Sequence, residues 1–229
     1  SGFDSVPASL GAQEFLKRIA LDGRTIKSFG GYYSMRGGLN GGTLASGLKL
    51  AEDKIAVPDS MRPGVFKVVA LNKYATDFVM APINERVVSL DCNVDYHEHL
   101  LTPNKLVANL VRAYFGLMGW LMGSSVGRSV LRKLGPKPGE GPSAKTIANG
   151  FVKHTFLEDE CENPLRLTFT WPGDPGNTVT VRCLIHTGLA LVDGESQAIG
   201  FTTPAAALGN TLLQRLLDAE VCSYTCNSE

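Results

Sequence analysis

The order of the expected helices and strands constrains the fold of this chain more than any other feature. Apolar residues spaced three and four apart predict helices over residues 1–22, 44–55, 105–134, 179–192 and 204–220. Alternating β-branched and aromatic residues predict strands over residues 25–35, 78–88, 94–101, 150–158 and 165–171, with the last two paired as a hairpin. Residues 56–77, which hold Pro58, Pro63 and Gly64, are expected to be irregular. Because strands and helices do not alternate strictly, the sequence predicts one α+β domain over residues 1–229, with a mixed sheet backed by helices.

Composition and charge restrict the class of protein. Hydrophobic residues make up 44% of the chain and charged residues 19%, which is typical of a globular protein and argues against disorder. The 22 basic and 22 acidic residues cancel, so the chain lacks the positive field of a general nucleic-acid binder. No targeting segment is visible at Ser1, and the five scattered cysteines favour a reducing compartment. We therefore expect a cytoplasmic protein, with attachment to the periphery of a membrane left open.

A glycine-dense stretch between residues 36 and 43 precedes the second expected helix. A flexible loop that enters a helix can present free backbone N–H groups to an anion. The stretch lacks the Lys-Ser/Thr pair of a Walker loop and does not match the dinucleotide fingerprint of a βαβ unit. The sequence thus predicts that this chain alone binds no nicotinamide cofactor. Two interpretations stay open, a glycine-rich turn in which Thr43 caps the helix, or one wall of a ligand pocket.

Metal-binding and catalytic patterns are weak. His97 and His99 on an expected strand would project to one face, as a metal pair requires, but no further ligands follow in order. We therefore expect surface or packing histidines and no metal site. The sequence contains no G-x-S-x-G elbow, and no cysteine has an obvious partner, so it identifies no catalytic residue.

The segment 104–134 combines a broad apolar helical face with local positive charge. Between residues 105 and 139 there are six basic residues and no acidic one. Arg112 interrupts the apolar run, which falls short of the roughly 20 residues that a membrane span needs. Burial of the broad face in the domain or in a dimer is one interpretation, and contact with a membrane surface or a substrate entrance is the other.

Six short motifs follow one another along nearly the whole chain. They are Gly2-Phe3-Asp4-Ser5-Val6-Pro7, Gly41-Gly42-Thr43-Leu44-Ala45-Ser46, Met80-Ala81-Pro82-Ile83-Asn84 with Arg86, Gly141-Pro142-Ser143, Gly173-Asp174-Pro175-Gly176 and Thr203-Pro204-Ala205-Ala206-Ala207-Leu208-Gly209. In this order they resemble the saccharopine dehydrogenase-like oxidoreductases, particularly the branch that includes trans-acting enoyl reductases.

The resemblance implies a role and several partners. Members of the family carry an N-terminal Rossmann domain that holds NADPH or NADH, and this chain is expected to begin where that domain ends, with residues 1–22 as the helix that leaves it. The resemblance then implies the substrate-binding and dimerisation domain of an enoyl or imine reductase that acts on an apolar small molecule. It suggests a homodimer through the sheet. Within it, Thr43, Ser46, Asn84 and Arg86 are candidate substrate-binding residues.

Two other functions remain open on the sequence. The chain could act alone as a non-redox enzyme, such as an isomerase or cyclase, that uses the pocket of a reductase. It could instead be a module that binds lipid or a membrane surface through residues 105–134. Activity without added nicotinamide would distinguish the first, and salt-sensitive binding to anionic lipid would distinguish the second.

Overall fold

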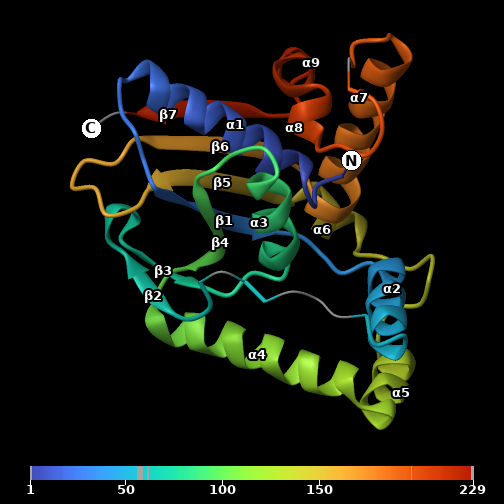
Figure 1. The fold of residues 1–229 in the computed structure, drawn as a ribbon. Coiled ribbons are helices and arrows are strands. Elements are labelled where there is room, and N and C mark those ends of the chain that lie inside the picture. Colours follow the sequence, from blue (N-terminus) through green and yellow to red (C-terminus); the bar gives the residue numbers. More distant parts are fainter. Residues whose placement is uncertain (1, 56–58, 61, 197, 228–229) are drawn as a thin grey trace.

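The centre of the molecule is a seven-stranded mixed sheet (Figure 1). The computed structural model describes residues 2–55, 59–60, 62–196 and 198–227. Within these residues the strand order is β2-β3-β4-β1-β5-β6-β7. The strands are β1 (Ser28–Arg36), β2 (Phe66–Val68), β3 (Lys73–Thr76), β4 (Asp95–Thr102), β5 (Phe151–Glu158), β6 (Arg166–Pro172) and β7 (Ser223–Asn227). Strands β1 and β4 pair in parallel and the other neighbours are antiparallel, which confirms the predicted α+β class.

Helices cover one face of this sheet and extend past its edge. They are α1 (Val6–Leu21), α2 (Gly41–Glu52), α3 (Ala81–Ser89), α4 (Lys105–Gly123), α5 (Ser125–Leu134), α6 (Ala144–Ala148), α7 (Thr180–Val192), α8 (Pro204–Ala207) and α9 (Gly209–Asp218). Two short turns, η1 (Val69–Leu71) and η2 (Pro175–Val179), complete the set. Helix α4 lies along the end of the molecule next to β2 and β3, and α5 turns away from it (Figure 1).

The main core lies between α1 and the sheet. Phe15 on α1 stacks on Phe29 of β1 at 5.2 Å between ring centroids, and Phe29 lies 4.9 Å from the ring of Tyr96 on β4. Each of these side chains is almost completely buried. Burying an aromatic side chain of this size contributes about 2–3 kcal/mol, so these rings fix the position of β1 and β4 under the helix.

The opposite face of the sheet is less apolar. A small cluster there joins Tyr32, Val68, Ala75 and Leu157 where the β2–β3 hairpin reaches the sheet. Beyond it, the hydroxyl groups of Thr155 and Thr168 form a cross-strand hydrogen bond of 3.1 Å. This face is therefore partly polar close to the strand that carries His97 and His99.

The structure corrects the predicted strand over residues 78–88. Residues Ala81–Ser89 form helix α3, with Pro82 in its first turn. Ala81, Asn84, Glu85 and Val88 are its buried residues, which is a helical spacing. The β-branched Val87 and Val88 favoured a strand locally, but the proline and this spacing favour a helix.

Four further predictions need correction. Residues 66–76, expected to be irregular, contain the antiparallel β2–β3 hairpin. The single helix over residues 105–134 is divided at Ser124, whose side chain caps α5 by accepting from Gly127 N. The last helix is capped by Thr203 as predicted, but Leu208 separates α8 from α9, which begins at Gly209 with φ +42°. Burial of the broad face of residues 105–134 within the domain is also wrong, because Ala108 is the buried residue of α4 and Gly127 that of α5. Its burial in a dimer stays a prediction.

Candidate functional site

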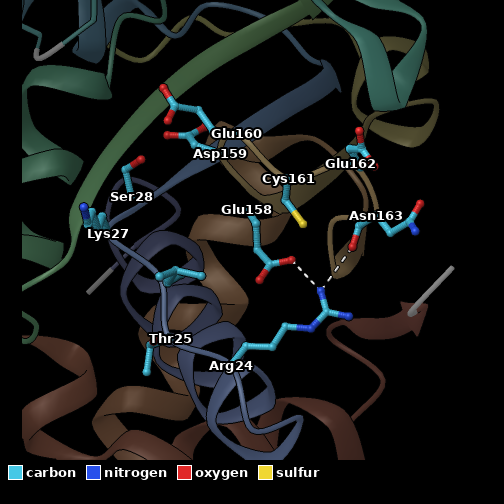
Figure 2. A pocket seen from close by; sticks show the side chains of 11 residues that line it. Arg24, Thr25, Lys27, Ser28, Glu158, Asp159, Glu160, Cys161, Glu162 and Asn163 are labelled. Atoms are coloured by element: carbon cyan, nitrogen blue, oxygen red, sulfur yellow. Dashed lines mark hydrogen bonds and ion pairs between the residues drawn. The ribbon is translucent and has the colours of Figure 1, made fainter.

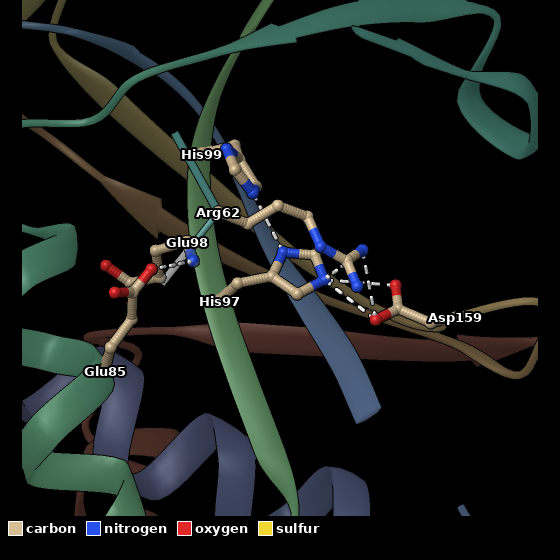
Figure 3. Close-up of polar contacts among 6 residues, drawn as sticks. All are labelled: Arg62, Glu85, His97, Glu98, His99 and Asp159. Carbon is tan, nitrogen blue, oxygen red and sulfur yellow. Dashed lines mark hydrogen bonds and ion pairs between the residues drawn. The ribbon is translucent and has the colours of Figure 1, made fainter. Parts of the chain in front are cut away.

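Strand β4 carries polar side chains on both faces of the sheet, and these form the candidate site. Because successive side chains of a strand point to opposite faces, Tyr96 and Glu98 face the helices while His97 and His99 face the other side. The four side chains are all nearly or fully buried. Figure 3 shows the two groups on either side of the strand, with Glu98 and Glu85 apart from the histidines.

On the helix side, the carboxyl group of Glu98 is the centre of a closed hydrogen-bond network. The hydroxyl of Tyr96 donates to Oε1 at 2.6 Å, and Nδ2 of Asn84 donates to Oε2 at 2.9 Å. The hydroxyl of Tyr33 lies 3.5 Å from Oε1. The network continues to His154, whose Nε2 lies 3.3 Å from the Tyr96 hydroxyl. A fully buried acid is thus surrounded by groups that satisfy it.

Two further contacts tie this network to other elements. Ser5, just before α1, donates its hydroxyl to Oδ1 of Asn84 at 3.3 Å. The backbone N–H of Glu98 donates to Oε1 of Glu85 at 3.0 Å, and the Ser60 hydroxyl donates to the same oxygen at 2.9 Å. Asn84, a predicted substrate-binding residue, therefore joins the motif that contains Ser5 to strand β4.

Burial favours the neutral form of four titratable groups in this network, Glu98, Tyr33, Tyr96 and His154. It raises the pKa of Glu98 to about 8, against the effect of the Tyr96 and Asn84 hydrogen bonds. Burial also raises the pKa values of Tyr33 and Tyr96 and lowers that of His154 well below its ordinary value. All four groups are consequently neutral at pH 7, which suits a site closed to water.

On the other side, His99, His97 and Asp159 form a chain of hydrogen bonds. Nε2 of His99 lies 2.8 Å from Nδ1 of His97, and Nε2 of His97 lies 2.8 Å from Oδ2 of Asp159. His97 Nε2 donates to the Asp159 carboxylate, and the facing nitrogens of His99 and His97 share one proton between them. Arg62 Nη1 lies 3.1 Å from His97 Nε2, but two donors cannot bond to each other. Arg62 therefore acts through its ion pair with Asp159 at 3.4 Å.

The pKa values of the two end groups of this hydrogen-bond chain, His99 and Asp159, are both lowered. Burial lowers the pKa of His99 to about 3, followed by the effect of His97 and Arg62, so His99 is neutral. Burial works to raise the pKa of Asp159, but the hydrogen bond and charge of His97, with Arg62, outweigh it and the pKa falls below its ordinary value. A carboxylate that orients an imidazole is an arrangement suited to proton transfer.

A cavity of about 740 Å³ opens beside Asp159 (Figure 2). Residues 24–28 and 158–163 line it. Arg24 Nη1 donates to Glu158 Oε2 at 2.8 Å and to the carbonyl oxygen of Asn163 at 3.1 Å, and these bonds hold the two segments together. Four acidic residues contribute to the lining together with the basic Arg24 and Lys27, so charges of both signs border the cavity.

A smaller cavity of about 310 Å³ lies where α1, α3 and α8 meet. Its lining is mainly small and apolar, and Asp91 is its acidic member. The Thr203 hydroxyl donates to Asp91 Oδ1 at 2.6 Å, and the Ser9 hydroxyl donates to Oδ2 at 3.3 Å. Since both carboxylate oxygens already accept hydrogen bonds, Asp91 mainly connects α1 to the start of α8.

The glycine-dense stretch is a packing junction. A Cβ atom on Gly38 would lie 2.3 Å from Pro142, and one on Gly41 would lie 1.8 Å from the carbonyl oxygen of Lys137. The backbone N–H of Gly38 already donates to the buried carboxylate of Asp174 at 2.9 Å. A phosphate would meet this carboxylate and find the space filled, so these residues do not fit the pyrophosphate of a dinucleotide. The interpretation as a glycine-rich turn is favoured, with Asn40, not Thr43, at the N-cap of α2.

The structure separates the four predicted substrate-binding residues. Thr43 and Ser46 are exposed on α2, and Arg86 is exposed on α3. Asn84 is buried in the Glu98 network. Among the described residues, no hydrogen bond links the α2 pair to the α3 pair. The expectation that Asn84 and Arg86 lie on a neighbouring strand is wrong, because both lie on a helix.

Sequence reasoning missed the residues around β4. His97 and His99 were expected to be surface or packing residues, and Glu98, Asp159 and Arg62 were not expected to have a role. The signal was present in the Tyr-His-Glu-His run at residues 96–99, where ionisable side chains occupy both faces of one expected strand. Within the described ranges, no group of three or more metal-ligating side chains could hold a metal ion.

Several known proteins are similar to nearly the whole chain. A candidate trans-acting enoyl reductase of Mycobacterium tuberculosis is 28% identical, over 98% of this chain and 65% of the relative. The trans-acting enoyl reductase of Mycobacterium bovis is 27% identical over 98% of this chain and 66% of its own length. That of Mycobacterium ulcerans is 26% identical over 94% and 63%. The chain therefore spans slightly less than two thirds of these relatives. No family model matches it, and no solved structure is similar to it. The likeness supports a reductase-related function.

Proposed function

We propose that this chain is the substrate-binding part of an enoyl reductase, and that the nicotinamide which donates hydride is bound outside the residues described here. The observation that carries the proposal is the likeness, over 98% of the chain, to proteins named trans-acting enoyl reductases. The space around Gly38 and Gly41 is already occupied by other residues, which supports the proposal that the nicotinamide is bound elsewhere. The saccharopine dehydrogenase-like motifs are consistent with such a division.

The reaction divides the work between the cofactor and the protein. Reduction of an enoyl group adds hydride to the β-carbon and a proton to the α-carbon, and NADPH or NADH supplies the hydride. The protein must orient the enoyl group and polarise its carbonyl oxygen. Thr43 and Ser46 lie one turn apart on the exposed side of α2, where both hydroxyls are free to donate to that oxygen. Arg86 offers a charge at the surface, while Asn84 acts by positioning.

Calorimetric titration of this chain tests both halves of the proposal. We expect it to bind an apolar trans-2-enoyl thioester and to bind neither NADPH nor NADH. The double change Thr43→Ala and Ser46→Ala should weaken thioester binding about tenfold, because two hydrogen bonds are lost. Thr211→Ala, on the exposed side of α9, is the matched control. Micromolar binding of NADPH would contradict the cofactor assignment, and failure to bind the thioester would contradict the substrate assignment.

The resemblance also supports a homodimer through the sheet. One chain has a mass of 24.5 kDa. Light scattering on the purified chain should give twice this mass. The mass of a single chain would contradict the dimer and leave the substrate assignment unaffected.

A second candidate function, isomerisation of a double bond without a nicotinamide, is favoured by the His97–Asp159 pair. In such a reaction a base removes a proton from one carbon and returns it to another, so no oxidant or reductant is needed. Incubation of the enoyl thioester with the chain alone, followed by NMR, would reveal a moved double bond. Asp159→Asn should abolish this change if the pair is responsible, and no change with the native chain would remove this candidate.

A further inference from the structure

We propose that helices α4 and α5 dock this protein onto the surface of an anionic membrane, with α4 lying in the plane of that surface. The inference does not depend on the proposed reaction. Helix α4 lies at one end of the molecule, next to the β2–β3 edge of the sheet (Figure 1). Its outer side is therefore available to a flat partner.

An apolar stripe runs along this outer side. Its members are spaced three or four residues apart and so share one face of the helix. Their exposed fractions are 70% for Leu106, 61% for Leu110, 54% for Tyr114, 54% for Leu117 and 69% for Trp120. Monomeric proteins rarely expose a contiguous apolar surface of this kind without a partner. Tyrosine and tryptophan within it are the side chains that favour the boundary between lipid and water.

Helix α5 also exposes apolar residues. Val126, Val130 and Leu134 recur every four residues there and are 74%, 41% and 83% exposed. Ser124 joins the two helices, because its hydroxyl donates to the Leu121 carbonyl oxygen of α4 at 3.4 Å and accepts from Gly127 N of α5 at 3.0 Å. Exposed apolar residues therefore occur on both helices, and α5 can add to the contact that α4 makes.

Charge identifies the partner. Residues 105–139 contain six basic side chains and no acidic one. Arg112 pairs with Asp77 and Arg132 with Glu52, but Lys105, Lys133 and Lys137 have no ion pair with other described residues. Unpaired lysines beside an apolar stripe are complementary to anionic lipid headgroups. A second copy of this chain would bring the same positive charge to the contact and would be repelled.

Contacts on the inner side of α4 determine its orientation. Of the described helices, α4 is the one long and apolar enough to cross a membrane by length and composition. However, the Thr76 hydroxyl donates to the carbonyl oxygen of Ala108 at 3.2 Å, and Arg112 Nε lies 3.1 Å from Asp77 Oδ2. These contacts bind the middle of the helix to β3 and the residue that follows it. Crossing a bilayer would break them, whereas lying on its surface leaves them in place.

Helix α7 provides a matched comparison. It also exposes apolar residues, and Leu184 is 54% exposed, the same fraction as Leu117. Acidic residues follow this helix, however, where Asp193 and Glu195 pair with Arg215. Anionic lipid should therefore not select α7, and Leu184→Asp is the control for Leu117→Asp.

Vesicle flotation tests the proposal with the full chain. We expect the protein to float with phosphatidylcholine vesicles that contain about 30% phosphatidylserine, and not with phosphatidylcholine alone. Raising the salt from about 0.1 M to about 1 M should release it. Leu117→Asp should reduce the floated fraction at least fivefold and Leu184→Asp should leave it unchanged. Lys105→Glu combined with Lys133→Glu should also reduce it and does not alter the apolar stripe.

Four flotation results would overturn the proposal. They are no flotation of the native chain, equal flotation with neutral vesicles, binding that persists at high salt, and equal losses for the α4 and α7 variants. Circular dichroism and light scattering accompany each variant. If Leu117→Asp unfolds the chain, the double variant Lys105→Glu and Lys133→Glu tests the proposal instead, and an unchanged floated fraction would overturn it. If it instead converts a dimer to a monomer, the stripe is a contact between two chains and the membrane proposal is wrong.

Discussion

The two faces of strand β4 hold polar groups of similar depth but different access to solvent. On the helix side, Glu98 is completely buried, and Tyr96 and Asn84 donate to its carboxyl oxygens. On the other side, His97 leads to Asp159, which lines a cavity. Burial alone therefore does not identify a functional group. A closed network mainly stabilises the fold, whereas a chain of hydrogen bonds that reaches a cavity can exchange protons with a ligand.

The largest effect should come from removing the acid on the closed side. Glu98→Ala leaves the Tyr96 hydroxyl and Asn84 Nδ2 buried without their acceptor and opens a cavity. We expect the free energy of unfolding to fall by about 3–5 kcal/mol, measured by urea denaturation. Glu98→Gln is the control, because its carbonyl oxygen keeps one acceptor, and it should cost less than half as much. Equal losses would mean that volume, not hydrogen bonding, matters at this position.

The pH dependence of stability should separate the two faces. The pKa of Glu98 is raised to about 8 in the folded chain, so the folded state binds a proton more tightly than the unfolded state. Its contribution to stability is complete below pH about 4.5 and declines as the pH rises to about 8. Urea midpoints measured from pH 5 to pH 9 should therefore decrease in the native chain more than in Glu98→Gln. Parallel curves would show that Glu98 titrates normally.

Asp159 on the open side should behave in the opposite way and with a smaller effect. Its pKa is lowered in the folded chain, so its contribution is present above pH about 4 and is lost as the pH falls further. Asp159→Asn should cost about 1–2 kcal/mol at pH 7 and less at pH 3. Glu162→Gln, an exposed neighbour on the cavity rim, is the control and should be neutral at both pH values. A loss that is independent of pH would remove the assigned role of the carboxylate.

Much of this architecture could be predicted from the sequence, and the exceptions have physical reasons. Periodicity placed β4 and the β5–β6 hairpin correctly, because a strand's pattern is local. It failed at α3, where the β-branched Val87 and Val88 outweighed Pro82 in the prediction. The candidate site was harder still, since Asp159 lies 62 residues from His97 and Arg62 lies 35 residues from it. Such contacts depend on how segments distant in the sequence come together in the fold, and the spacing of residues along the chain does not predict this.

The smallest effect should come from Arg62, and it decides which partner controls Asp159. The Arg62 side chain is 49% exposed, and its ion pair with Asp159 spans 3.4 Å. An exposed pair of this kind is worth less than about 1 kcal/mol, so Arg62→Met should cost less than Asp159→Asn. If the His97 hydrogen bond holds the pKa of Asp159 low, the acid-side pH dependence should persist in Arg62→Met and disappear in His97→Phe. The reverse result would place control with the arginine, and the open side of β4 would then be an ion pair at the surface and not a route for protons.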